Sequence, residues 1–206
     1  GKLLLSFLVA VVLLYLLGVV AGWRDVMSVT GHVYPEIESI DPDETYKGPR
    51  LTYRNMGNGK FEDVTDRSGP GTMAHHASHG AAFGDYDNDG DIDIVVMNMD
   101  EPPSLLRNDQ TSDNHWIKLK LQGTVSNRSA IGAVATIHVG EGTQTTPVMS
   151  GASFISLNDM RLHFGLGKAT GVDKITIKWP AGGTEEFPGV KADRLYLLVE
   201  GTGVAK

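Results

Sequence analysis

A long apolar run opens the chain and predicts a membrane-spanning helix. Residues 3–23 are almost entirely apolar, interrupted only by one serine and two glycines. As an α-helix these 21 residues reach about 31 Å, the thickness of the hydrocarbon core of a bilayer. Trp23 and Arg24 end the run, and an aromatic residue followed by a charge is typical of a membrane interface. We therefore predict a transmembrane anchor over residues 1–23.

A cleaved signal peptide and a buried core helix are the alternative interpretations of this run. Val19-Val20-Ala21 fits a cleavage site, but the run exceeds the ~7–15 apolar residues of a typical signal core, which favours an anchor. Residues 24–50 carry three basic and six acidic groups. Because basic residues collect on the cytoplasmic side, this balance favours a body on the periplasmic or extracellular side.

The segment at residues 24–50 has the composition of a linker. Pro35, Pro42 and Pro49 punctuate an acidic stretch that shows no helical period. We predict a flexible tether or a strap that lies along a partner.

Beyond residue 50, short apolar runs separated by turn clusters predict an all-β body. In the C-terminal part the period of two is plain, since Ile117 and Leu119 flank Lys118 in an alternating run. No segment of the body keeps the i, i+3, i+4, i+7 spacing of an amphipathic helix. We divide the body into a unit at residues 51–114 and a β-sandwich or barrel at residues 115–206.

Composition and charge narrow the classes of function. The 25 glycines and 7% aromatic residues fit many turns and short strands. Because the chain has no Cys, it has no disulfide scaffold, thiolate-ligated zinc or thiolate nucleophile. Residues 1–114 carry 8 basic and 18 acidic residues, a net charge of −10, whereas residues 115–206 carry 10 and 7, a net charge of +3. Neither half has the basic patch that nucleic acid requires, and the acidic half points to a bound cation.

The densest acidic segment has the spacing of a calcium loop. It reads Asp85-Tyr86-Asp87-Asn88-Asp89-Gly90-Asp91-Ile92-Asp93, with carboxylates at positions 1, 3, 5 and 9 and glycine at position 6. Alternate side chains of a curling loop converge on one centre, where Ca²⁺ accepts hard oxygen ligands. The backbone carbonyl at position 7 adds a further oxygen. We therefore predict a Ca²⁺ site formed by Asp85, Asp87, Asp89, Asp91 and Asp93.

This loop differs from an EF-hand. Position 12 is Val96 rather than a bidentate Glu, and both flanks are strand-like. We therefore expect Asp93 to close the site and the loop to join two strands. The alternatives are an empty, solvated turn, since Asp and Asn favour turns, and Mg²⁺, which prefers a smaller octahedral shell.

Two parts of the body resemble known families. Residues 51–65 (LTYRNMGNGKFEDVT) and 84–93 (GDYDNDGDID) are similar to an FG-GAP/VCBS repeat, the calcium-binding blade unit of integrin-type β-propellers. Four later blocks resemble the ASPIC/UnbV domain of bacterial cartilage-acidic-protein-like proteins: Asn114–Trp116, Ser126–Ala133, Arg161–Gly167 and Trp179–Gly183. The resemblance implies an extracytoplasmic location, a calcium-bound blade and a β-sandwich-like domain for adhesion or interaction, without defined catalytic residues.

The chain departs from a propeller in the number of blades. It holds sequence for about one blade before the C-terminal domain, and a single blade does not bury both faces or cap its own edges. We therefore expect this unit to pack against the C-terminal domain or against another protein.

The histidines give a second set of candidate ligands. His75, His76 and His79 offer three imidazoles to zinc or copper, and with such a metal to hydrolysis, although their spacing matches no defined motif. His163 is expected to bond a backbone group at the sheet surface.

No catalytic motif occurs in the chain, since phosphate-loop, dinucleotide and nucleophile-elbow patterns all fail. The sequence therefore predicts a non-catalytic, calcium-binding accessory subunit that contacts membrane lipid and other integral membrane proteins of a complex, photosynthetic or respiratory among the possibilities. The alternative is an extracytoplasmic adhesion or carbohydrate-binding module, in which Trp116 or Trp179 stacks on a glycan.

Overall fold

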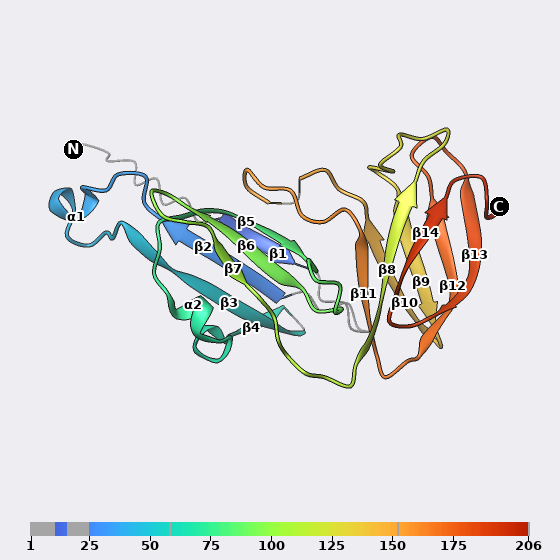
Figure 1. The fold of residues 1–206 in the computed structure, drawn as a ribbon, viewed down its shortest axis with the longest axis horizontal. Helices are drawn as coiled ribbons and strands as arrows, with labels where there is room; N and C mark the ends of the chain where they lie inside the picture. The colour runs from blue at the N-terminus through green and yellow to red at the C-terminus, as the bar shows by residue number, and fades with distance from the viewer. Residues whose placement is uncertain (1–10, 16–24, 58, 152, 206) are drawn as a thin grey trace.

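Short β-prone runs form four sheets within residues 11–15, 25–57, 59–151 and 153–205, the part of the chain that this computed structural model describes. Figure 1 shows two sheets in the N-terminal half and two in the C-terminal half, with the halves side by side along the long axis. The described helices have only three or four residues each. The prediction of an all-β body is therefore confirmed.

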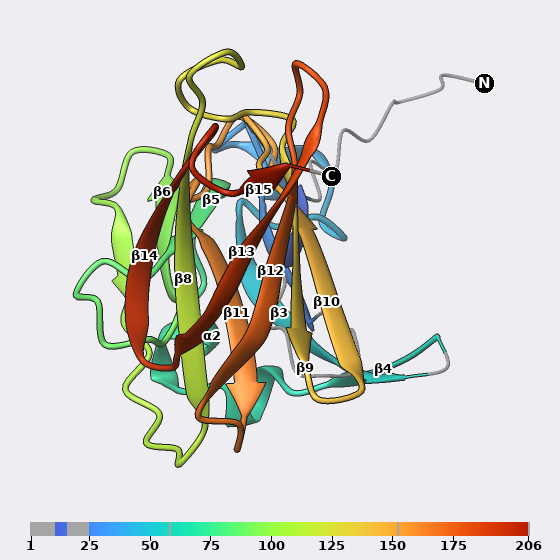
Figure 2. The ribbon, with the colours of Figure 1, turned by 90° about the vertical axis from the view of Figure 1, so that its right-hand side faces the viewer.

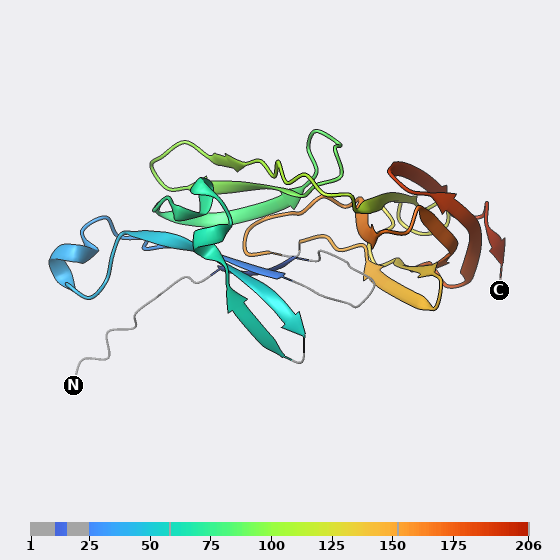
Figure 3. The same ribbon diagram turned by 90° about the horizontal axis from the view of Figure 1, so that it is seen from below.

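The N-terminal half contains two antiparallel sheets, with strand orders β1-β2-β3-β4 and β5-β6-β7. The strands are β1 (Val11–Tyr15), β2 (Asp25–Gly31), β3 (Lys47–Gly57), β4 (Lys60–Asp63), β5 (Ser78–Gly84), β6 (Asp93–Asn98) and β7 (Ser104–Leu106). The helical turns between them are α1 (Ile37–Ile40), the 3₁₀ helix η1 (Thr65–Arg67) and α2 (Pro70–Met73). The two sheets lie one above the other, and the β3–β4 hairpin of the first sheet projects away from the second (Figure 3).

An apolar layer holds these two sheets together. Met27 and Val29 of β2 pack against Phe83 of β5 and Val96 of β6, and each of the four is at most 4% exposed. Removal of this apolar surface from water stabilises the pair by roughly 25 cal/mol per Å² buried. One face of the β5-β6-β7 sheet is therefore covered by the sheet that contains β2.

Arg50 of β3 adds a polar link between the same sheets. Its guanidinium donates hydrogen bonds to the carbonyl oxygen of Gly71 at 2.9 Å, to Asn98 Oδ1 at 3.2 Å and to Ser104 Oγ at 2.7 Å. Burial lowers the pKa of Arg50, and the negative charge of Glu101 acts in the opposite direction. The cation is thus held by neutral acceptors in the sheet-to-sheet interface.

The C-terminal half is a sandwich of a five-stranded sheet, β10-β9-β12-β13-β15, and a three-stranded sheet, β11-β8-β14 (Figure 2). Its strands are β8 (His115–Gln122), β9 (Val134–Val139), β10 (Gly142–Pro147), β11 (Leu162–Gly167), β12 (Gly171–Lys178), β13 (Thr184–Lys191), β14 (Arg194–Val199) and β15 (Val204–Ala205). Only β14 and β8 pair in parallel among these described strands. Ile117 and Leu119 of β8 pack with Ile137, Phe164 and Ile175 in one buried cluster, as their alternation predicts.

Most of the anchor predicted over residues 1–23 lies outside the described residues. Its described part, Val11–Tyr15, is strand β1, which pairs with β2 from Val11 opposite Val29 to Tyr15 opposite Asp25. Valine and tyrosine favour strands, and β2 offers a free edge for pairing. Within the described ranges, no helix is long and apolar enough to cross a membrane.

The linker predicted over residues 24–50 is corrected, because this segment supplies β2 and the start of β3. Only the excursion between these strands, with α1, keeps the acidic, proline-containing character. Pro49 is tolerated inside β3 because it lies where the β2–β3 register shifts, and its carbonyl accepts a hydrogen bond from Thr30 Oγ1 at 2.9 Å. The single unit predicted over residues 51–114 is likewise divided between the two N-terminal sheets.

Candidate metal site

The acidic loop joins two antiparallel strands, as its strand-like flanks predict. Gly84 at the end of β5 pairs with Asp93 at the start of β6, and residues 85–92 form the connection. Asn88 and Gly90 take positive φ angles of 62° and 100°, which turn the chain tightly enough to bring alternate side chains together.

Three of the five predicted ligands converge in this loop. Asp85, Asp87 and Asp89 each place one carboxylate oxygen within 4.8 Å of the others. Asp85 is fully buried, whereas the side chains of Asp87 and Asp89 face solvent. A cation at their centre would thus be bound by one buried carboxylate and two exposed carboxylates.

Asp93 and Asp91 have other positions in the loop. The Asp93 carboxylate accepts hydrogen bonds from the backbone N–H of Tyr86 at 3.2 Å and of Asn108 at 2.9 Å, so it fastens the base of the loop. Burial raises the pKa of Asp93, and these two hydrogen bonds partly oppose the rise. Burial and then the negative charge of Asp89 raise the pKa of Asp91. The Asp93 side chain thus holds the loop, and its predicted closure of the metal site stays a prediction.

Asp85 shows that the loop suits a hard cation. Its Oδ2 accepts a hydrogen bond from the backbone N–H of Gly90 at 2.9 Å and pairs with Lys118 Nζ, whereas its Oδ1 is buried without a hydrogen-bond partner. A buried carboxylate oxygen without a partner is costly, and a divalent ion satisfies it. The donor set is all oxygen, which is the set that Ca²⁺ and Mg²⁺ prefer.

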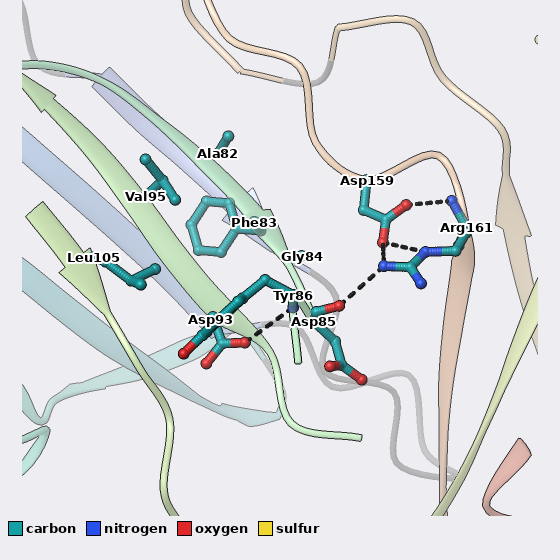
Figure 4. A pocket seen from close by; sticks show the side chains of 10 residues that line it. All are labelled: Ala82, Phe83, Gly84, Asp85, Tyr86, Asp93, Val95, Leu105, Asp159 and Arg161. Atoms are coloured by element: carbon teal, nitrogen blue, oxygen red, sulfur yellow. Dashed lines mark hydrogen bonds and ion pairs between the residues drawn. The ribbon is translucent and has the colours of Figure 1, made fainter. Parts of the chain in front are cut away.

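The C-terminal half reaches the loop through side chains that sequence reasoning did not identify as part of the site. Arg161 donates to the backbone carbonyl of Asp85 at 2.9 Å, and Asp159 holds the guanidinium in place (Figure 4). Arg161 also donates to Asn88 Oδ1 at 2.7 Å. Burial lowers the pKa of His163, and its Nε2–H donates to the carbonyl of Gly90 at 2.8 Å, which confirms the expected backbone bond.

Gly90 lies directly against the indole of Trp116. A Cβ atom at position 90 would fall 1.8 Å from Trp116 Nε1, so only glycine permits this approach. The glycine at position 6 of the loop therefore serves both the turn and the contact between the two halves.

A shallow cavity of ≈ 270 Å³ lies beside the loop (Figure 4). Asp85, Asp93 and Arg161 line its polar end, while Val95 and Leu105 line the apolar end on the outer face of the β5–β6–β7 sheet. The polar end of this cavity thus lies next to the acidic loop.

The remaining sequence candidates lie elsewhere. His76 Nδ1 lies 2.7 Å from Glu101 Oε2, and among the described residues the histidine cluster with His75 and His79 does not form a group of metal ligands. Trp179 is 2% exposed in the sandwich core, and Trp116 stacks on His163 with ring centres 6.1 Å apart. Trp179 is therefore unable to stack on a glycan.

Together the fold and the loop define a β-protein in which an acidic hairpin loop is docked on a β-sandwich. The carboxylates of this loop have the spacing of a metal-binding loop. Residues 22–96 match the FG-GAP-like repeat, and residues 123–205 match the family described as ASPIC and UnbV. The first match begins before the predicted boundary at residue 51, which agrees with the position of β2 in the N-terminal sheets.

Two curated relatives are similar to this chain. They are cartilage acidic protein 1 of Xenopus tropicalis and of Homo sapiens, each 26% identical over 124 residues. The matched region covers 58% of this chain but 18% and 17% of the respective relatives, so this chain spans less than a fifth of their length.

Proposed function

We propose that this chain is a non-catalytic, calcium-binding interaction module that works outside the cytoplasm. Two observations on one residue set carry the calcium proposal: the carboxylates of Asp85, Asp87 and Asp89 converge, and Asp85 has a buried Oδ1 without a hydrogen-bond partner. The FG-GAP-like repeat and the ASPIC and UnbV domain support an extracellular or periplasmic setting.

The form of the loop favours Ca²⁺ over Mg²⁺. The three carboxylates lie on an irregular loop with two of them exposed to solvent, and Ca²⁺ accepts 6–8 oxygen ligands in flexible geometry. Mg²⁺ requires a near-ideal octahedron at about 2.0–2.1 Å and gives up its water reluctantly. When bound, the ion would neutralise the repulsion among the acidic side chains and fasten the β5–β6 hairpin.

The outer face of the β5–β6–β7 sheet supports an interaction role. Val95, Met97 and Leu105 are 41%, 51% and 51% exposed there, while the opposite face is packed against β2. An exposed apolar surface between acidic and polar residues is typical of a protein contact. The proposed partners are integral membrane proteins of a complex.

Calorimetric titration of the full chain in mild detergent tests the calcium proposal. Ca²⁺ should bind with one site per chain and more tightly than Mg²⁺, and Asp87→Asn or Asp89→Asn should abolish the heat. Asp66→Asn is the control, because its carboxylate is 79% exposed outside the loop. Unchanged calcium binding in both loop variants would contradict the proposal.

Crosslinking in membranes tests the interaction proposal. Leu105→Glu should remove crosslinks to neighbouring membrane proteins, because a charge on the apolar face opposes its burial in a contact. Val125→Glu is the control, since Val125 is 83% exposed on the C-terminal half. Identical crosslinks in both variants would exclude this face as the contact.

A further inference from the structure

Lys118 is a buried lysine that faces the acidic loop from the C-terminal half. It lies on β8 between Ile117 and Leu119, which point into the sandwich core, so its side chain leaves the opposite face of the strand. That side chain is only 2% exposed. Lysine is almost never fully buried unless it is paired, so its environment requires an explanation.

The acidic loop supplies the partners of this lysine. Lys118 Nζ pairs with Asp85 Oδ2, lies 3.5 Å from Asn88 Oδ1 and lies 5.3 Å from the centre of the Trp116 ring. Lys118 is the β8 side chain that brings a formal positive charge to this contact. It faces the acidic loop, where residues 85–93 include five carboxylates. The C-terminal half thus places a fixed cation next to the candidate metal site.

Asp85 connects this lysine with the candidate ion. One of its oxygens is occupied by Lys118 and the Gly90 N–H, and the other, Oδ1, is the buried atom without a partner. An ion bound at Oδ1 would share the carboxylate with Lys118, and two cations at one carboxylate repel each other strongly where water is excluded.

We propose that Lys118 is a built-in counter-cation of the loop, through which the C-terminal half sets the calcium affinity. This inference rests on the proposed calcium site. Lys118 compensates the buried charge of Asp85 in the calcium-free protein and thereby holds the loop docked. The same positive charge repels the ion, so the site binds calcium more weakly than the loop would without Lys118.

A purely structural ion pair makes a different prediction. Removal of one partner from a buried pair destabilises a protein because the other charge stays uncompensated. If Lys118 had only this role, Lys118→Met would lower the melting temperature equally with and without calcium. If Lys118 competes with the ion, calcium replaces the lost charge, and the variant recovers when calcium is added.

The experiment compares the full chain, Lys118→Met and Lys120→Met in mild detergent, by calcium titration and by thermal unfolding in EDTA and in saturating Ca²⁺. Lys120 is the matched control, because it lies two residues along the same strand with an exposed side chain. Lys118→Met should bind Ca²⁺ at least tenfold more tightly than the unchanged chain. It should melt lower in EDTA and show the larger rise with calcium, while Lys120→Met should match the unchanged chain in all measurements.

Each outcome separates the two proposals. Equal calcium affinity in Lys118→Met and the unchanged chain overturns the role of Lys118 and leaves the calcium site intact. Absence of calcium binding in every chain overturns the proposed function and this inference with it. If Lys118→Met folds only in calcium, the inference is supported. If it does not fold at all, Lys118→Gln, which retains a hydrogen-bond donor to Asp85, takes its place with the same expected increase in affinity.

Discussion

The contact between Gly90 and Trp116 gives a direct test of how the acidic loop is docked. In Gly90→Ala, the new methyl group would fall 1.8 Å from Trp116 Nε1 and 2.3 Å from two indole carbons. The backbone at position 90 has a φ of +100°, which L-residues rarely adopt. The substitution therefore combines a backbone cost with a steric cost.

The structure allows these two costs to be separated. Gly182 has almost the same backbone angle, with a φ of +103°, but no heavy atom lies within 4 Å of a Cβ at that position. Alanine at a strained φ costs about 1–3 kcal/mol, so this is the expected loss of unfolding free energy for Gly182→Ala. Overpacking adds about 1–3 kcal/mol at position 90. A weakened hydrogen bond from His163 to the Gly90 carbonyl adds about 1 kcal/mol.

We therefore expect Gly90→Ala to lose about 2–4 kcal/mol more unfolding free energy than Gly182→Ala. Urea unfolding followed by circular dichroism and tryptophan fluorescence measures both losses. Trp116→Ala should remove the difference, since the added methyl group then meets no indole. Equal losses for the two glycine variants in the unchanged background would show that the loop does not lie on Trp116.

Three further predictions concern other parts of the molecule. Calcium at about 100-fold above its Kd should raise the free energy of unfolding by about 2.7 kcal/mol, and EDTA should remove this increase. Asp87→Asn should melt at the same temperature with and without EDTA. Arg50→Met should lose about 2–4 kcal/mol in urea unfolding, because it leaves the buried oxygens of Gly71 and Asn98 without their donor, whereas Arg54→Met on the same strand is exposed and should lose little. Burial opposes ionisation of Glu200, but hydrogen bonds from Ser126, Thr124 and Val125 outweigh it and lower its pKa from 4.5 to about 2. The stabilising contribution of Glu200 is therefore present above pH 4.5 and lost as the pH falls toward 2. The melting temperature of Glu200→Gln should fall less across this range than that of the unchanged chain. Glu141→Gln, at an exposed position, is the control and should follow the unchanged chain.

Local patterns predicted the features that depend on local structure. The alternation at Ile117 and Leu119 identified β8 because one face of a sandwich strand packs into the apolar core and the other does not. The spacing of Asp85, Asp87 and Asp89 placed them together because it is set within a single hairpin loop. Both results required no knowledge of distant contacts.

Features that depend on contacts far apart in the sequence were missed. β2 pairs with β3 across an acidic excursion, and the prolines and charges of that excursion conceal the strands on either side. Lys118 has the same place in the alternation as the exposed Lys120, and no signal in the sequence of β8 separates them. The difference arises only because the acidic loop, about thirty residues earlier, covers one lysine and not the other.

The expectation that a lone blade must rely on its neighbours is met in two places. Its inner face is covered by β2, and the free edge of β5 is covered by a segment of the C-terminal half. There the Asp159 N–H donates to the Phe83 carbonyl at 2.9 Å, Asn158 Oδ1 accepts from the Phe83 N–H at 3.1 Å and Ser153 Oγ donates to the Ala81 carbonyl at 3.1 Å. A capped edge resists pairing with other chains. The same segment leads directly into Arg161, which donates to the Asp85 carbonyl, so the residues that cap the edge also position a side chain that holds the acidic loop. Protection of the edge and the position of the loop therefore depend on one docking contact.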